Sequence, residues 1–183
     1  MGIVTLAAAK AQLNIAASDT GDDVELQGYI DAATAAVETQ LGLVVEPRTV
    51  TDELSCAAGT RTLLLRSVPV LSLTSVTSLD GSQSWAVGPS VMRVDSASGL
   101  VTVLSGPAFS GTVLVTYQAG TTVIPANWRL ATLIIIQHLW ETQRGRAGAV
   151  PGGSDEPEYF PGRGFAIPRR AVELLETTLP GVA

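Results

Sequence analysis

Few side chains in this sequence can carry out chemistry on their own. Its 183 residues include one cysteine and one histidine. Cys56 alone cannot form a disulfide within the chain, and His138 alone excludes a metal site built from several histidines. A nucleophile pair of Cys56 and His138 has no support in the residues around either position. We therefore expect neither a disulfide nor a cofactor.

Charged residues are also scarce, and acidic residues outnumber basic ones. They make up 15% of the chain, against about 25% in an average protein. With 17 acidic and 11 basic residues, the net charge is −6. Nucleic-acid readers usually carry a basic patch, whereas the one dense basic cluster here is Arg163, Arg169 and Arg170. The composition disfavours a nucleic-acid reader and favours a surface partly covered by other subunits.

The sequence lacks a long hydrophobic run. The longest one, 130–136, is interrupted by Thr132 and is far shorter than the roughly 20 residues that span a bilayer. The first residues do not combine a charged segment with a long apolar one, so we expect no signal peptide. The expectation is a protein without a membrane segment that stays in the cytoplasm where it is made.

Helical periodicity is strongest towards the two ends of the chain. Residues 5–15 read as a short helix with Thr5 as its N-cap. A second helix is expected over 22–41, because acidic residues at its start suit the helix dipole and Gly42 is a typical stop. Its apolar stripe consists of Leu26, Ile30, Ala33, Val37 and Leu41.

A third helix is expected over Ala126–Arg144, after Pro125, whose missing N–H costs nothing in a first turn. It is apolar around most of its circumference, which predicts burial on more than one side. One of its faces carries Leu130, Leu133, Ile134 and Gln137. A Gly- and Pro-rich stretch then leads to a short helix over 168–178, with an apolar stripe of Val172, Leu175 and Leu179.

Between the helices lie six short runs rich in Val, Leu and Thr, several of which alternate apolar with polar residues as strands do. Turn signals separate them at Asp80-Gly81, Ser98-Gly99 and Gly106-Pro107. Connections this short favour antiparallel pairing. The predicted fold class is α+β, with an antiparallel β-rich segment inserted into a helical core. The predicted parts are N-terminal helices over 1–43, the β-rich insert over 44–120, a long core helix over 121–145, and a flexible linker with a C-terminal helix over 146–183.

No catalytic constellation emerges from the motifs. His138 and Glu141 form an H-x-x-E pair on one helical face, but a metal site needs further ligands, so a structural histidine is the favoured interpretation. No G-x-S-x-G elbow occurs, and the glycine-rich GRAGAVPGG has no lysine after it. We expect no enzyme. Two alternatives stay open: a small metal-dependent enzyme at His138 and Glu141, and a β-rich binding module with Trp85 as its main exposed aromatic.

Several residues are candidates for contacts with other chains. Trp128 and Trp140 fall on nearly the same side of the third helix, where they can serve core packing or subunit contact. Arg169 and Arg170 start the last helix, where positive charge opposes the dipole, and acidic groups of a partner would suit them. For subunit packing the predicted residues are Trp128, Ile134, Ile135 and Trp140.

The order of these parts resembles the head–tail connector (adaptor) proteins of long-tailed phages. In their typical opening pattern, Leu-x-x-Ala-Lys-x-x-Leu-x-Ile, the matching residues are Leu6, Ala9, Lys10, Leu13 and Ile15. The second helix matches the family's next helix at Leu26, Ile30 to Ala33, Val37, Glu38, Leu41 and Gly42. The family's strand, Y-x-x-G turn and proline-led apolar helix are matched by Tyr117, Gly120, Ile124, Pro125 and Leu130. The β-rich insert is larger than the simplest helical members of the family need.

This resemblance implies a structural protein of the virion neck that is made in the host cytoplasm. Such proteins form a ring, usually of twelve copies, beneath the portal protein. The ring extends the channel through which genomic DNA passes without sequence-specific binding, and it supports the stopper and tail proteins. Their C-terminal part docks on the portal, and the residues at that position here are Arg169, Arg170, Val172, Leu175 and Leu179. A stopper or tail-completion protein of the same neck is the alternative.

Overall fold

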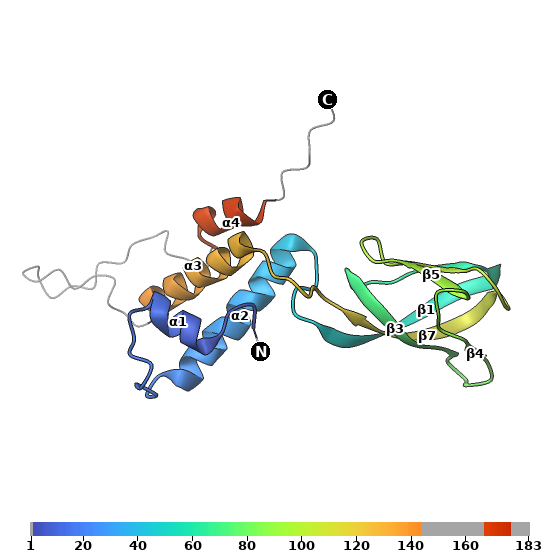
Figure 1. Ribbon diagram of the computed structural model, residues 1–183, viewed down its shortest axis with the longest axis horizontal. Coiled ribbons are helices and arrows are strands. Elements are labelled where there is room, and N and C mark those ends of the chain that lie inside the picture. Colours follow the sequence, from blue (N-terminus) through green and yellow to red (C-terminus); the bar gives the residue numbers. More distant parts are fainter. Residues whose placement is uncertain (1, 144–166, 177–183) are drawn as a thin grey trace, which may run out of the picture. The chain divides into compact units, whose positions relative to one another are not determined.

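The computed structural model describes residues 2–143 and 167–176. The chain divides into two compact units. The helical unit comprises Met1–Gly42 and Ile124–Ala183, and the β unit comprises Leu43–Val123. Figure 1 shows the helices of the first unit and the strands of the second. Helices and antiparallel strands are both present, as the predicted α+β class requires.

The described part of the helical unit contains the helices α1 (Leu6–Gln12), α2 (Asp23–Leu41), α3 (Ala126–Gln143) and α4 (Arg169–Leu175). All four were predicted. The expected end of the third helix at Arg144 lies outside the described residues, whereas α4 is shorter than predicted, because it ends at Leu175 and Glu176 is already extended. The side chain of Thr5 caps α1 by accepting a hydrogen bond from the Ala8 N–H at 3.2 Å. Gly42 ends α2 with a φ of 65°, a left-handed conformation that favours glycine.

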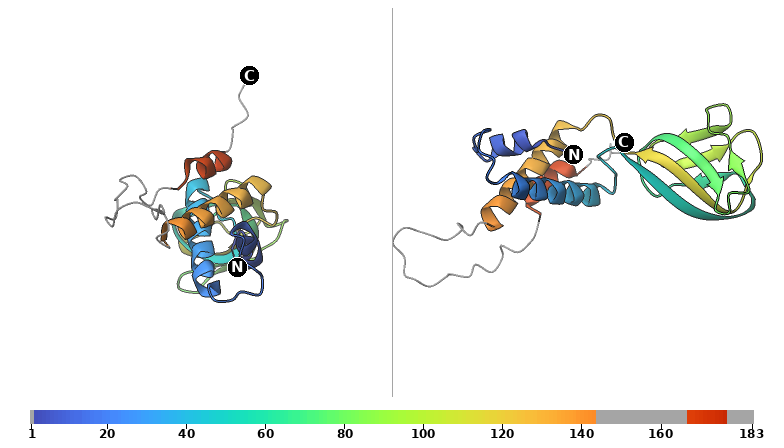
Figure 2. Two further views of the ribbon diagram at one scale, coloured as in Figure 1. Left: turned by 90° about the vertical axis from the view of Figure 1, so that its left-hand side faces the viewer. Right: turned by 90° about the horizontal axis from the view of Figure 1, so that it is seen from below.

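Packing of the helical unit follows the predicted stripe of α2. Leu26, Ile30, Ala33 and Val37 are fully buried, and α2 packs against α3 (Figure 2). The prediction for α3 needs correction. Its buried residues, Ala131, Thr132, Ile135 and Ile136, lie on one face, whereas Leu130 is 43% exposed. An apolar composition around a helix therefore did not mean burial on several sides within one subunit.

Lys10 ties α1 to the start of α2. It is 5% exposed, its ammonium donates to the Asp19 carbonyl oxygen at 2.6 Å, and its Nζ lies 2.5 Å from Asp23 Oδ1. A buried ammonium needs such partners, because an unpaired charge away from water is very costly. The lysine of the N-terminal pattern is thus a structural tie between two helices.

The β unit consists of two antiparallel sheets. One has four strands in the order β1-β7-β3-β4, and the other has three in the order β2-β6-β5. The two-residue strand β4 was not predicted, because a period of two cannot be recognised in so short a run. The strands are β1 (Arg48–Thr60), β2 (Thr62–Leu64), β3 (Val70–Ser78), β4 (Ser84–Trp85), β5 (Met92–Asp95), β6 (Leu100–Val103) and β7 (Phe109–Ala119).

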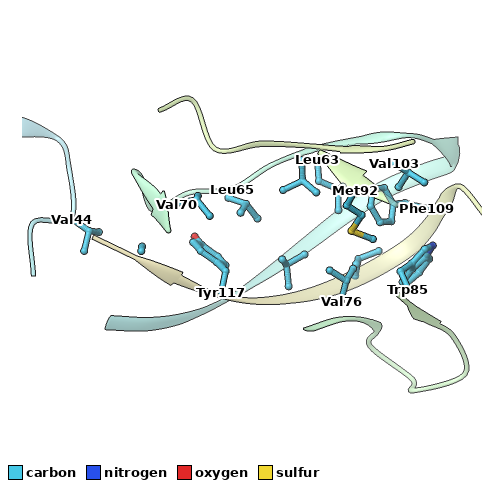
Figure 3. Close-up of a cluster of buried hydrophobic side chains, with 14 residues drawn as sticks. Val44, Leu63, Leu65, Val70, Val76, Trp85, Met92, Val103, Phe109 and Tyr117 are labelled. Atoms are coloured by element: carbon cyan, nitrogen blue, oxygen red, sulfur yellow. The ribbon is translucent and has the colours of Figure 1, made fainter. Parts of the chain in front are cut away.

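Alternate residues of these strands form one apolar core, shown in Figure 3. Tyr117 of β7 is fully buried there, and its hydroxyl donates to Asp52 Oδ2 at 2.8 Å and accepts from the Ser67 N–H at 3.0 Å. Asp52 Oδ2 also accepts from the Arg66 N–H at 2.7 Å. These bonds fix the chain that follows β2 against the inner side of β1.

Gly120 explains the second half of the Y-x-x-G pattern. Its φ is 135°, a backbone conformation that residues with a Cβ rarely adopt. A Cβ at this position would lie 2.6 Å from the Cα of Pro47, so any larger residue would collide with the backbone. The pattern therefore marks a close crossing of two chain segments within the β unit.

Candidate interaction surfaces

Helix α4 presents two different faces. Ala171 and Leu175 are buried, and Val172 is half-buried. Arg169 and Arg170 are exposed, so the structure separates the predicted docking residues into an inner apolar set and an outer basic pair. Leu179, the last predicted docking residue, lies outside the described residues.

Contacts of α4 are made chiefly with α3, beside which it lies in Figure 1, and also with α2. The Asn127 amide donates to the Leu174 carbonyl oxygen at 2.8 Å, which satisfies one carbonyl at the end of the short helix. On the outer face, Arg169 Nε lies 3.1 Å from Glu173 Oε1 with both side chains largely exposed. Such a pair contributes at most about 0.5 kcal/mol. The inner face therefore holds α4 in place.

The four residues predicted for subunit packing have different environments. Ile135 is 4% exposed and belongs to the core of its own helical unit. Trp140 lies edge-on to Tyr29 of α2, with ring centroids 6.4 Å apart. Trp128 and Ile134 are half-buried. Trp140 is half-buried as well, so three of the four residues keep part of their surface open and only Ile135 is buried.

His138 and Glu141 lie near the end of α3, where one hydrogen bond within the helix leads to another that joins α3 to α1. Glu141 Oε1 accepts from the Gln137 amide at 2.9 Å, and Gln137 Oε1 accepts from the Gln12 amide of α1 at 2.9 Å. Among residues 2–143 and 167–176, no three His, Cys, Asp or Glu side chains are grouped so that they could hold a metal ion. The geometry describes a polar link between α1 and α3.

The expectation that Trp85 is an exposed aromatic is wrong. The side chain is 5% exposed, its indole N–H donates to the Pro107 carbonyl oxygen at 3.1 Å, and its ring lies 5.2 Å from that of Phe109. Figure 3 shows it at one end of the apolar core. The sequence around Trp85 is polar and gives no sign of the two-residue strand β4, which turns this side chain into the core.

Cys56 lies in β1, where its thiol donates to the Gly111 carbonyl oxygen at 3.3 Å. Burial raises the pKa of this thiol, which lowers its thiolate fraction at neutral pH. Neither feature favours a nucleophile.

A shallow pocket of about 390 Å³ lies in the β unit, where the turn after β3 meets the start of β7. Hydrogen bonds from Ser78 and Ser82 lower the pKa of Asp80 to about 2, so this carboxylate is ionised at neutral pH. Sequence reasoning used Asp80 only as a turn signal and missed the pocket, because its walls come from distant strands. The lining residues are Ser78, Leu79, Asp80, Ser82, Gln83, Ser110, Gly111 and Thr112.

Within the described part of the chain, no helix is both long enough and apolar enough to cross a membrane.

Solved structures with a similar fold come from gene transfer agent (GTA) particles. A chain from the neck of an empty GTA particle, computed with C6 symmetry, is 19% identical with a TM-score of 0.63, and the match covers 98% of this chain and 93% of that chain. A chain from the virion of the native particle gives the same values. A chain from the native neck, computed with C12 symmetry, has a TM-score of 0.56 at 19% identity and covers 86% of this chain and 85% of that one. At this identity the likeness establishes the fold.

No curated protein matches the sequence. A family model described as head completion protein matches residues 2–170, which include the helices α1, α2 and α3, the whole β unit and the first two residues of α4. The match spans far more than half of the chain, so the chain belongs to the head completion protein family.

Proposed function

We propose that the chain is a structural head–tail connector of a virion neck. In this proposal, copies of it form a ring beneath the portal that extends the DNA channel and joins the capsid to the stopper and tail. The observation that carries the proposal is the family match over residues 2–170. The neck chains of similar fold, computed with C6 and C12 symmetry, support a ring.

The ring needs surfaces that join neighbouring copies, and the helical unit offers candidates. Among its described residues, the large apolar side chains that are exposed are Val24 of α2, at 89%, and Leu130 of α3, at 43%. Leu130 lies one helical turn from the half-buried Ile134. We assign Ile134 and Trp128 to the contact with a neighbouring copy, while Ile135 and Trp140 act by stabilising the helix that carries them.

Docking on the portal is assigned to α4. Arg169 and Arg170 are exposed at the start of this helix, where positive charge opposes the helix dipole. Acidic groups on the portal would relieve this unfavourable placement and orient the subunit as it binds.

A non-enzymatic role follows from the same proposal. A connector binds other proteins and lets genomic DNA pass, so it needs no reactive centre. The net charge of −6 suits DNA that slides past without being held, because an acidic wall repels phosphates.

Charge reversal in α4 tests the proposal. The variant Arg169→Glu with Arg170→Glu should bind the isolated portal ring of the same virus at least about tenfold more weakly than the unmodified chain. Arg93→Glu, at an exposed position of β5, is the matched control and should bind normally. Equal binding by all three proteins would contradict docking through α4, and binding of the unmodified chain to a tail component alone would favour a stopper or tail-completion protein.

A further inference from the structure

The two sheets of the β unit carry different side chains on their outer faces. On the sheet β1-β7-β3-β4 the outer positions are rich in hydroxyls, and the side-chain oxygens of Thr51 and Thr116 lie 3.0 Å apart there. On the sheet β2-β6-β5, Leu64 of β2 lies opposite Leu100 of β6, and these side chains are 63% and 39% exposed. Two facing leucines on one sheet thus occupy the kind of position that threonines occupy on the other.

These leucines cannot turn into the core. Leu63 of β2 and Val103 of β6 already contribute to it from the same strands (Figure 3), and successive side chains of a strand point to opposite faces. Leu64 and Leu100 therefore face away from the core, with Leu104, 52% exposed, further along the same row of β6. We call these three residues the leucine face. Apolar side chains gathered on an outer surface, unlike scattered ones, are typical of a surface that binds another protein.

Basic residues flank the leucine face. Arg61 comes directly before β2, and Arg66 follows Leu64 by two positions, which places it on the same side of the chain. Both arginines are exposed. Arg93 of β5 also points outward, but Asp95 shares its face two positions along that strand, so their charges offset each other. The leucine face therefore has an excess of positive charge around it, although the net charge of the whole chain is −6.

The helical unit carries a surface of the opposite kind at the start of α2. Val24, in the first turn, is 89% exposed, more than any other exposed large hydrophobic residue that the structure describes. Residues 19–25 contain four acidic residues and no basic one, although Lys10 pairs with the Asp23 carboxylate. The helix dipole explains the acidic residues but not the exposed valine among them. An apolar side chain in an acidic setting is complementary to leucines in a basic one.

We propose that the leucine face of one copy binds the start of α2 in the neighbouring copy. The leucines pack around Val24, and the arginines at the two ends of β2 face the acidic residues beside it. A closed ring of identical copies needs a contact between two different surfaces of the chain, and one surface on each unit supplies it. The inference rests on the proposed function, from which it takes the ring. To the contact assigned to Trp128 and Ile134 it adds a second one, which joins unlike units.

Cross-linking on the portal ring of the same virus tests this contact. Leu64→Cys and Val24→Cys are made as separate chains, each with Cys56→Ser so that no other thiol is present, and are mixed in equal amounts on the ring. A short bismaleimide should join the two kinds of chain, because their cysteines meet between copies. The mixture should give at least about tenfold more cross-linked dimer than either chain alone. Thr51→Cys in place of Leu64→Cys is the matched control and should give little, since Thr51 is exposed on the other sheet.

A chain with both Leu64→Cys and Val24→Cys distinguishes a neighbouring copy from the chain's own helical unit. Contact between copies should give a ladder of linked chains on a denaturing gel. A link confined to single chains would overturn the proposal, because the leucine face would then be covered by its own chain.

Removing the leucines tests how much they contribute to binding. Leu64→Ser with Leu100→Ser should leave the thermal midpoint almost unchanged, because both side chains are exposed. At least about tenfold more of this variant should be needed to fill the portal ring. Leu79→Ser, at a position after β3 that is 54% exposed, is the control and should fill the ring normally. Equal filling by both variants would contradict the contact.

The outcomes separate this contact from the proposed function. If the chains move with the portal ring but the mixture gives no more cross-linked dimer than the Thr51→Cys control, the contact is wrong and the connector function stands. If the folded, unmodified chain does not move with the ring either, the connector function fails and this contact fails with it.

Discussion

The helical unit and the β unit solve the same problem of a buried charge in different ways. In the helical unit, the buried Lys10 has the carboxylate of Asp23 at 2.5 Å and a carbonyl oxygen at 2.6 Å. In the β unit, Asp52 is 6% exposed and accepts bonds from the Tyr117 hydroxyl and the Arg66 N–H. The first solution joins two helices that are near in sequence, whereas the second joins strands 65 residues apart. The partners of Lys10 are near it in the sequence, whereas the partner of Tyr117 cannot be read from the chain around it.

The largest effect should come from a charge in the helical core. Ile136→Asp places a carboxylate where the native side chain is fully buried, which should cost about 4 kcal/mol or more of the free energy of unfolding. Far-UV circular dichroism should show loss of helix. Leu130→Asp is the control and should melt almost normally, because Leu130 is 43% exposed. Equal losses in both variants would contradict the one-sided burial of α3.

The second largest loss of stability should come from removing the Tyr117 hydroxyl, which ties the strands of the β unit together. Tyr117→Phe removes the hydroxyl that bonds Asp52 and the Ser67 N–H and leaves both without that partner. Unpaired buried groups of this kind cost about 2 kcal/mol. The midpoint of urea denaturation measures the loss. Thr116→Val, which removes an exposed hydroxyl bond to Thr51, should change stability by less than about 0.5 kcal/mol.

Removing the polar contacts of Lys10, which tie α1 to α2 in the helical unit, should lower stability less. Lys10→Met keeps the length of the side chain but removes its two polar contacts, at a cost of about 1.5 kcal/mol. Asp23 Oδ1, the oxygen that faces Lys10, is buried, but the side chain as a whole is 28% exposed, so hydration of its other oxygen limits the loss. The same replacement at Arg169, whose pair with Glu173 is exposed, should have almost no effect on thermal unfolding. A larger loss for Arg169→Met than for Lys10→Met would reverse the assignment of the structural tie.

Alkaline pH should weaken the β unit gradually. Burial raises the pKa of Tyr117 above its usual value, and the hydrogen bond with Asp52 acts in the same direction. The folded chain therefore keeps this proton where the unfolded chain has begun to lose it, so stability is full below the unfolded pKa and falls as pH rises through the folded one. Urea midpoints measured from about pH 9 to about pH 11 should decline for the unmodified chain and less for Tyr117→Phe. Parallel declines would mean that another group is responsible.

The helices were predictable because their signals are local. Thr5, Gly42 and Pro125 mark helix ends through neighbouring backbone groups, and the stripe of α2 needs only a period of 3.6 residues. The buried face of α3 was not predictable in the same way. Nearly every face of that helix is apolar, so only the positions of α1, α2 and α4 decide which residues are covered.

The strand pairing of the β unit could not be predicted from the sequence. Alternation of apolar and polar residues predicted the strands, but it does not say that β1 pairs with β7, some 60 residues away. The contact of Tyr117 with Asp52 depends on that pairing, and the pocket around Asp80 depends on the pairing of β3 with β7. Only one property of α4, its apolar stripe, was predictable. Its apolar stripe is readable from spacing, whereas the surface of α3 that covers it is a tertiary feature.

Sedimentation of the full chain with the portal ring of its own virus tests the central claim most directly. A connector should move with the ring at about one copy for each portal subunit, and the double Arg169→Glu and Arg170→Glu variant should stay behind. A folded chain that never moves with the ring, at any concentration up to that of the assembled neck, would contradict the claim.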